Sequence, residues 1–365
     1  MSNETIGNVP FLKIHRAWMD WNLSNSGRRR SSLHPRIRIS SAHDEWNHVV
    51  IPLIALAKGF FAEEDLEDVE LVTLESEGAS LEALNQGLVD FAVDPVTPYV
   101  LKAINNGIDI FIIGPRRRTH AFFLFGQKGM KSPRDLKGGK INVFTPGDEM
   151  TVQSTQVIRD AGMVPDVDVK IDYYNGDMHD ILGMEDAFRR GEAQGLLAVN
   201  VQVERLKSEG FPILVNLQEA YLPRQDRVMV ATGQMVNYHH NTVKRFLKGM
   251  IRANRYFMER RNKEEIIRFI EDAGFAQIVQ ADRKLFEAMF ENSYTRIPPD
   301  CHLPVEAVDQ AIKEQIAQGN IDESITVERI VRIKALQEAQ QEVGVTTSNE
   351  QPARIKAPPV TVPPA

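Results

Sequence analysis

From Pro35 onward the chain alternates between stretches with the spacing of a strand and stretches with the spacing of a helix. Residues 36–40 read Arg-Ile-Arg-Ile-Ser, in which every second side chain is apolar, and residues 49–64 carry apolar side chains at helical spacing. The same order returns over residues 69–93, where an alternating stretch precedes a helical one and a short apolar run. Strands that alternate with helices predict βαβ units and a mostly parallel sheet, so the predicted fold class is α/β.

A second set of such units follows in the middle of the chain. Residues 141–144 read as a short strand, and a helix that ends at Gly191 leads into an apolar strand, as the helix that ends at Gly87 does. This similarity indicates two lobes of the same kind, although chance is the alternative because helices commonly end at glycine. From Asn241 to about residue 345 the pattern is helical, and the proline-containing stretch 346–365 is predicted to be disordered.

Composition limits the classes of protein that this chain can belong to. With 365 residues, 42% of them hydrophobic, the chain is long enough for two cores. Its net charge of -7 argues against nucleic acid as a partner, because phosphate binding normally needs a basic face. The one cysteine, Cys301, excludes an internal disulfide and a cysteine-rich metal site, and no cofactor is expected.

The first 35 residues are polar and interrupted, and we expect a flexible leader there. A secretory signal would need a basic start and an apolar run of about 7–15 residues, and no such run follows. No stretch approaches the roughly 20 apolar residues of a membrane-spanning helix, so no membrane insertion is predicted. As written, the sequence predicts a cytoplasmic protein, or a periplasmic one if the start codon is misassigned.

Three segments together resemble a known family. They are LIALAKGFFAEEDLEDVELVTLESEGASLEALNQGLVDFAV, SPRDLKGGKINV and FLKGMIRANRYF. In order and spacing the chain resembles, over about residues 36–340, the solute-binding proteins of nitrate, sulfonate and taurine type ABC importers, a group shared with the thiamine-pyrimidine-synthase-like proteins. The resemblance implies the type II periplasmic-binding fold, in which two α/β lobes close on a small molecule by a hinge.

The same resemblance implies how the chain is divided and what it binds. Residues 36–115 would form lobe 1, residues 116–230 lobe 2, and residues 231–345 would return to lobe 1 and add the C-terminal helices. The changeover would lie near Gly114–Phe123 and the return near Met229–Thr232. The implied partners are a small organic anion, held between the lobes, and an ABC permease.

In this family the ligand contacts come from loops that follow strands, which agrees with the general rule for α/β sheets. The corresponding loops here are Ala42–Asn47, Asp94–Thr97, Thr145–Thr151 and Asn200–Gln202. The ligand-binding residues that we predict are His43, Trp46, Asn47, Asp94, Thr97, Arg117, Thr145, Glu149, Thr151 and Asn200.

Several of these residues have two interpretations. The Thr145 loop runs into a helix whose N-terminus favours an anion, yet Asp148 and Glu149 could cap that helix instead. Thr97 has the spacing of an N-cap before Pro98. Arg117 lies in the middle of an Arg-Arg-Arg run expected to form a turn, where a guanidinium could hold a planar anion or be solvated.

The cluster His43-Asp44-Glu45-Trp46-Asn47-His48 raises the question of catalysis. Trp46 offers a surface for stacking on a ring, and Asp44 could orient His43 for acid-base chemistry. The alternatives are a ligand-binding loop and a structural loop. A metal site is not predicted, because the histidines and carboxylates lack the spacing of metal ligands.

The resemblance also extends to cytosolic enzymes of the same fold. The cysteine-rich run of the thiamine pyrimidine synthase is absent, and the loop that holds the nucleophilic cysteine of an aromatic sulfinate desulfinase here contains His43 and Asp44. The desulfinase's Arg-X-Gly-Gly motif has no match either. Two hypotheses therefore stay open, a solute-binding protein for a carboxylate, sulfonate or aromatic acid, and a lyase or decarboxylase that acts on an aromatic or heterocyclic acid with His43 and Asp44 as catalytic residues.

Overall fold

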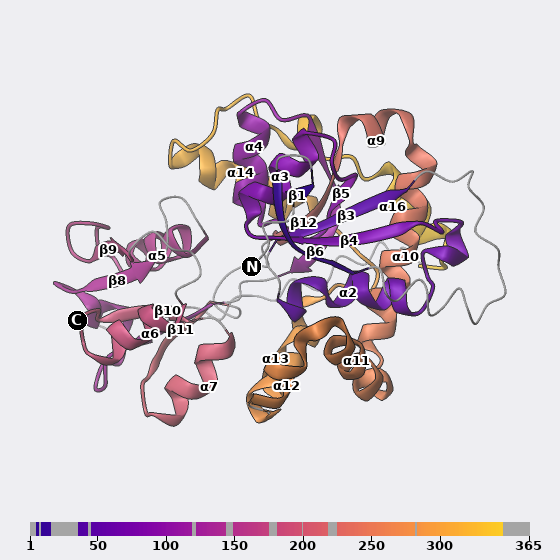
Figure 1. Cartoon of the computed structure of the whole chain (residues 1–365). Coiled ribbons are helices and arrows are strands. Elements are labelled where there is room, and N and C mark those ends of the chain that lie inside the picture. Colours follow the sequence, from indigo (N-terminus) through magenta and orange to yellow (C-terminus); the bar gives the residue numbers. More distant parts are fainter. Residues whose placement is uncertain are drawn as a thin grey trace.

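The structure of the chain is a computed structural model with two β-sheets, each accompanied by helices (Figure 1). It describes residues 5–6, 9–15, 36–42, 45–118, 122–143, 149–174, 181–198, 200–217, 225–281 and 283–345. The larger sheet has the strand order β1 (Thr5–Ile6), β2 (Val9–His15), β4 (Val69–Leu74), β3 (Ile37–Ala42), β5 (Phe91–Ala92), β12 (Gln225–Thr232) and β6 (Ile110–Arg118). The smaller sheet has the order β11 (Ile213–Asn216), β7 (Phe123–Gly126), β10 (Gly195–Ala198), β8 (Lys140–Val143) and β9 (Lys170–Tyr173).

The larger sheet belongs to lobe 1, and three of its strands run in the same direction. Strand β3 is parallel to both β4 and β5, and β12 is antiparallel to both β5 and β6. Strands β3, β5 and β6 therefore run in the same direction, and their carboxyl ends lie at one edge of the sheet. We call this the carboxyl edge of lobe 1.

The chain leaves lobe 1 through β6 and returns through β12 (Figure 1). Strand β6 ends at Arg118 and lobe 2 begins with β7 at Phe123, within the changeover segment that the resemblance implies. The return differs from the expectation, because β12 already begins at Gln225 rather than near Met229. Strand β12 begins at Gln225 because Gln225 pairs with Arg118, the last residue of β6.

Part of the expected leader is a strand. Val9–His15 forms β2, which pairs antiparallel with β4 and covers an edge of the lobe 1 sheet. The expectation of an irregular leader is therefore wrong over this segment. Its physical reason is that an uncovered strand edge has unpaired backbone groups, which a short segment rich in apolar residues can satisfy. The tail predicted over residues 346–365 lies outside the described residues.

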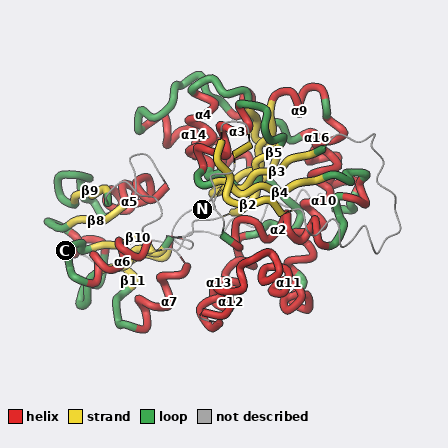
Figure 2. Tube along the Cα trace, viewed as in Figure 1, coloured by secondary structure: helices red, strands yellow, loops and turns green. Residues whose placement is uncertain are grey.

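Helices cover both sides of the lobe 1 sheet (Figures 1 and 2). Helices α2, α10 and α11 pack together on one side, whereas α3, α4 and α14 pack together on the other. The prediction of a helical C-terminal region is confirmed. The helices of lobe 1 are α2 (Trp46–Ala57), α3 (Glu77–Asn85), α4 (Thr97–Asn105), α9 (Gly233–Tyr238), α10 (His240–Met258), α11 (Lys263–Ile270), α12 (Ala276–Ala281), α13 (Arg283–Arg296), α14 (Val305–Ala317), α15 (Val327–Ile330) and α16 (Lys334–Glu342).

Lobe 2 has a hydrophobic core of its own, separate from that of lobe 1. Its helices are α5 (Glu149–Asp160), α6 (Ile181–Arg189) and α7 (Asn200–Ser208). Helix α13 of lobe 1 contacts α7 of lobe 2, so the C-terminal helices reach across to the second lobe. Among the described residues, no helix is both long enough and apolar enough to cross a membrane.

A stack of three phenylalanine rings joins α10 to the sheet of lobe 1. The ring of Phe246 lies 4.1 Å from that of Phe91 on β5 and 5.8 Å from that of Phe61. Gly249, one turn along α10, makes this approach possible, because a Cβ there would lie 2.5 Å from Cδ1 of Phe61. The stack holds the longest helix of the described chain against the centre of the sheet.

We predict that Phe246→Ala lowers the free energy of unfolding by about 3–5 kcal/mol, because the substitution leaves a cavity in a well-packed core. Equilibrium unfolding in urea measures this change. Tyr238→Ala, at a side chain that is 81% exposed, is the control and should change the free energy by less than about 0.5 kcal/mol. Equal effects of the two substitutions would contradict the importance of the ring stack.

Candidate functional site

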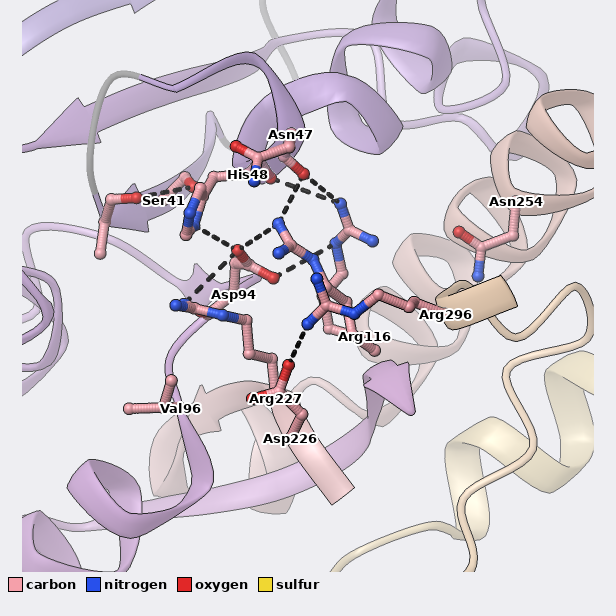
Figure 3. A network of polar contacts seen from close by, with 12 residues as sticks. Ser41, Asn47, His48, Asp94, Val96, Arg116, Asp226, Arg227, Asn254 and Arg296 are labelled. Atoms are coloured by element: carbon pink, nitrogen blue, oxygen red, sulfur yellow. Dashed lines mark hydrogen bonds and ion pairs between the residues drawn. The ribbon is translucent and has the colours of Figure 1, made fainter. Parts of the chain in front are cut away.

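The carboxylate of Asp94 is the centre of a polar network at the carboxyl edge of lobe 1 (Figure 3). Asp94 follows β5 and its side chain is fully buried. Four basic side chains surround it: His48 Nδ1 at 2.5 Å, Arg117 Nη2 at 3.0 Å, Arg227 Nη1 at 3.6 Å and Arg116 Nε at 3.7 Å. These partners come from the first turn of α2, from β6 and from β12, so one carboxylate holds four segments together.

The basic groups control the ionisation of Asp94. Burial alone would raise the pKa of the carboxyl, but Arg117, Arg227 and His48 outweigh burial and hold that pKa well below its ordinary value. Burial also lowers the pKa of the Arg117 guanidinium to about 9, although Asp94 opposes the shift. Asp94 is therefore an anion at neutral pH.

A second carboxylate, Glu77, extends the network into α3. Arg227 Nη1 donates to Glu77 Oε1 at 2.8 Å and to the carbonyl oxygen of Asp94 at 2.5 Å. Burial of Glu77 raises the pKa of its carboxyl even though Arg227 acts in the opposite direction. Burial alone would lower the pKa of the Arg227 guanidinium, but the carboxylates of Asp94 and Glu77 outweigh burial and raise that pKa. Arg227 therefore stays charged between the two carboxylates.

Hydrogen bonds to backbone atoms connect the loop after β5 to both crossover strands. The hydroxyl of Thr97 donates to the carbonyl oxygen of Gln225 at 2.6 Å, and Gln225 Nε2 donates to the carbonyl oxygen of Arg117 at 2.9 Å. Arg117 Nη2 also donates to the carbonyl oxygen of Asn47 at 2.6 Å. The strands that leave and re-enter lobe 1 are thus fixed to the first turn of α2 and to the segment after β5.

Positive charge exceeds negative charge in this network. Its charged side chains are the buried Arg116, Arg117 and Arg296 and the 15% exposed Arg227, against the buried Glu77, Asp94 and Asp226. Arg296 and Asp226 form their own buried pair at 2.5 Å. Arg116 Nη1 and Arg296 Nε have no hydrogen-bond partner among the residues that the structure describes. The edge therefore favours a further negative charge, as an anionic ligand would supply.

Comparison with known protein families identifies the family to which the chain belongs. The sequence model of the NMT1/THI5-like family matches residues 46–263, which is more than half of the chain. The chain belongs to the NMT1/THI5-like family. None of the curated proteins compared with the chain is significantly similar to it in sequence.

Solved structures similar to this NMT1/THI5-like protein show its fold. The periplasmic aliphatic sulphonate binding protein SsuA from Escherichia coli is 14% identical, with a TM-score of 0.66 and coverage of 82% of this chain and 92% of that one. The periplasmic nitrate-binding protein NrtA from Synechocystis PCC 6803 is 15% identical, with a TM-score of 0.63 and coverage of 85% and 89%. A DszB mutant in complex with biphenyl-2-sulfinic acid is 12% identical, with a TM-score of 0.64 and coverage of 84% and 100%.

These similarities confirm the resemblance inferred from the sequence at the level of family and fold. The NMT1/THI5-like chain has the two-lobed α/β fold of the periplasmic binding proteins. Its lobe 1 contributes β3, β5 and the crossover strands to the edge where the polar network lies. The similar structures fix the fold, and the roles of single residues must come from the contacts of this chain.

The side chains of two predicted ligand residues contact other parts of lobe 1. Trp46 is only 2% exposed, and its indole packs against Phe286 at 4.9 Å and Phe290 at 5.8 Å. Glu45 is the N-cap of α2, so Trp46 is the first residue of the helix and not part of an exposed loop. Its side chain is buried in the core. Thr97 is the first residue of α4, whose N-cap is Val96, and its hydroxyl serves the β12 backbone instead of capping the helix.

The arginine run differs most from its prediction. Arg117 was expected in a turn, where its guanidinium would hold an anion or be solvated, but β6 continues through Arg118 and pairs with β12. Arg116 and Arg117 are buried because Asp94 compensates their charge. Arg117 is therefore bound to protein groups on both sides and contributes to the network, as Asp94 and the carbonyl group of Asn47 do.

Other predicted residues lie at the edge of what the structure describes. His43, Asp44 and Thr145 fall outside the described residues. Glu149 and Asn200 are the first residues of α5 and α7, and their side chains are not described either. Thr151 is buried in the first turn of α5. No group of three potential metal ligands occurs in the described part of the chain.

Sequence reasoning missed six ionisable members of the network as site residues: His48, Glu77, Arg116, Asp226, Arg227 and Arg296. The signal that could have pointed to Arg227 is that its charged side chain directly precedes the mostly apolar stretch Val228–Thr232. A charge beside such a stretch requires a buried partner. No local pattern could have supplied the identity of that partner, because Glu77 is 150 residues away in the chain.

We predict that Asp94→Asn lowers the free energy of unfolding by about 3–5 kcal/mol, because it leaves several guanidinium groups buried without a compensating charge. Chemical denaturation at neutral pH measures the effect. Asp172→Asn is the matched control, since Asp172 pairs with Lys140 on the partly exposed sheet of lobe 2 and such pairs contribute roughly 0.2–1 kcal/mol.

The pH dependence gives an independent check of the same substitution. The pKa of Asp94 is lower in the folded state, so its contribution is complete above the unfolded-state pKa of about 3.9 and is lost at lower pH. The difference in unfolding free energy between the native protein and Asp94→Asn should therefore shrink as pH falls below about 4. A difference that is constant with pH would show that the charge of Asp94 is not what stabilises the network.

We also predict that Cys301 does not react with a disulfide reagent in the folded protein. Its thiol is buried and accepts a hydrogen bond from Asn254 Nδ2 at 3.1 Å, and burial raises the pKa of the thiol to about 12. Titration with the reagent at mildly alkaline pH should detect one thiol only after denaturant is added. Rapid reaction without denaturant would contradict the burial of Cys301.

Proposed function

We propose that this protein is a solute-binding protein of the ABC-importer type, which captures a small organic anion between its two lobes. The observation that carries the proposal is that arginines outnumber carboxylates in the polar network at the carboxyl edge of lobe 1. Buried guanidinium groups are costly unless a negative charge is near, and protein carboxylates compensate only part of this set. An anionic solute at the edge would supply the remainder.

The position of the network supports a ligand at this edge. In open α/β sheets, ligands bind outside the carboxyl ends of the strands. Asp94 and Asn47 follow β5 and β3 there, and the strands β6 and β12 that connect the lobes pass beside them. A ligand between the lobes would contact these loops and the predicted loops of lobe 2, which begin α5 at Glu149 and α7 at Asn200.

The similar structures support an oxyanion as the ligand class. Three of them are a sulphonate-binding protein, a nitrate-binding protein and a protein in complex with a sulfinic acid. All three ligands carry oxygen atoms with negative charge, which guanidinium groups and helix N-termini bind well. For this chain we propose a carboxylate, sulfonate or aromatic acid.

An importer role implies a second partner and a location. The loaded protein would deliver its solute to an ABC permease, and the periplasmic alternative of the two predicted locations then applies. The sequence also left open a lyase with His43 and Asp44 as catalytic residues. Both residues lie outside the described residues, so this alternative stays open, and the experiment includes a check for chemical change.

We expect a thermal-shift screen of the purified protein to find stabilising ligands among small carboxylates, sulfonates and aromatic acids, but not among amines with the same carbon skeletons. A ligand at about 100 times its Kd adds about 2.7 kcal/mol to the free energy of unfolding. Each ligand that stabilises the protein is then incubated with it and recovered for mass spectrometry.

The outcomes separate the two hypotheses. Recovery of unchanged acid supports the solute-binding function. Recovery of a decarboxylated or otherwise cleaved product would instead identify an enzyme. The proposed preference for anions would be contradicted if amines stabilised the protein as strongly as acids do. It would also be contradicted if neither amines nor acids stabilised it.

A further inference from the structure

Arg118 is the last residue of β6 and lies at the point where the chain leaves lobe 1. Its position is the carboxyl edge of the sheet, opposite Gln225 on β12. The side chain is partly buried, which for a guanidinium carries a cost in solvation that a bound anion would reduce. Any ligand held between the lobes at this edge would be close to the end of β6.

The two arginines that precede Arg118 are already engaged by protein groups. Arg117 donates to Asp94 and to the carbonyl oxygen of Asn47. Arg116 pairs with Asp94 and approaches the carbonyl oxygens of Asn47 and His48 at 3.4 Å. The Arg-Arg-Arg run therefore contains two side chains with structural partners within lobe 1.

Arg118 differs from both. Among the residues that the structure describes, its guanidinium has no hydrogen bond and no ion pair. The acidic group that acts on it electrostatically is Asp300, which is engaged by Arg255 Nε at 2.7 Å. Burial lowers the pKa of Arg118, with only Cys301 and Asp300 acting in the opposite direction. The group is thus charged, partly desolvated and without a carboxylate of its own.

We infer that Arg118 binds the acid group of the solute and so sets the preference of this protein for an oxyanion. This inference rests on the proposed solute-binding function. A guanidinium presents two parallel N–H donors that match two oxygen atoms of one carboxylate or sulfonate group. Lysine cannot reproduce this arrangement, because its ammonium group is a single point of charge.

The inference assigns different roles to three adjacent residues. Arg116 and Arg117 hold the loop after β5 and the first turn of α2 in place through Asp94 and Asn47. Arg118 contacts the ligand from that fixed frame. The choice of Arg117 made from the sequence is therefore replaced by its neighbour, which is the arginine of the run without an acceptor within the described chain.

Isothermal titration calorimetry with an acid identified by the screen tests the inference. Arg118→Gln should weaken binding by about 10- to 150-fold, as expected for the loss of hydrogen bonds between charged groups. Arg118→Lys keeps the charge but loses the paired donors, so its affinity should lie between those of Arg118→Gln and the native protein. Both variants should melt within a few degrees of the native protein without ligand.

Arg159→Gln provides the matched control. Arg159 is an exposed arginine in the last turn of α5, and its substitution should change the affinity by less than about twofold. If Arg118→Gln and Arg118→Lys bind the acid as tightly as the native protein does, the assignment of Arg118 is wrong and the solute-binding function stands. If the native protein binds none of the acids, the proposed function itself fails.

Discussion

A fully buried carboxylate must have its charge compensated within the protein, and the arrangement of lobe 1 depends on how this requirement is met for Asp94. In a medium of low dielectric constant, the solvation lost by such a group exceeds the total stability of most domains unless opposite charges lie within a few ångströms. Arg117, Arg227 and His48 provide that compensation. Because these residues come from β6, β12 and α2, the electrostatics of one side chain fixes the relative position of three elements that lie far apart in the sequence.

The same interaction explains why the site lies where it does. The strands that leave and re-enter lobe 1 carry Arg117 and Arg227, and both side chains pair with Asp94 in the loop after β5. Figure 3 shows Arg227 beside Asp94. If the lobes close by a hinge, as proposed, these strand ends would stay with lobe 1. The surface that lobe 1 offers to a solute is then pre-organised, which reduces the cost of ordering it on binding. Helix α13 adds a second connection, since it contacts α7 of lobe 2 and its last residue, Arg296, pairs with Asp226 on β12.

The fold was predictable from the sequence because the periodicity of its apolar residues is local information. The strand of residues 36–40 and the helix that follows it appear as β3 and α2, and the helical pattern after Asn241 appears as α10–α16. The site was predictable only as a set of loops. An indole such as that of Trp46 can stack on the ring of a ligand, and this is why the sequence suggested Trp46 as a ligand residue. In the structure Trp46 packs against Phe286 and Phe290, more than 200 residues away in the chain, and no local pattern reveals such a contact. The burial of Arg116 and Arg117 likewise depends on Asp94, a partner that only the folded chain brings near.

The central claim is that charge at the carboxyl edge of lobe 1 selects the ligand. The most direct measurement compares the affinity of the native protein for one bound acid with its affinity for the primary amide of the same acid, by calorimetry at neutral pH. The two compounds have nearly the same shape and differ in charge. The account predicts that the amide binds at least about 100-fold more weakly, because it cannot compensate the excess of guanidinium groups. Equal affinity for the acid and the amide would show that shape, and not charge, determines binding, and would contradict the account.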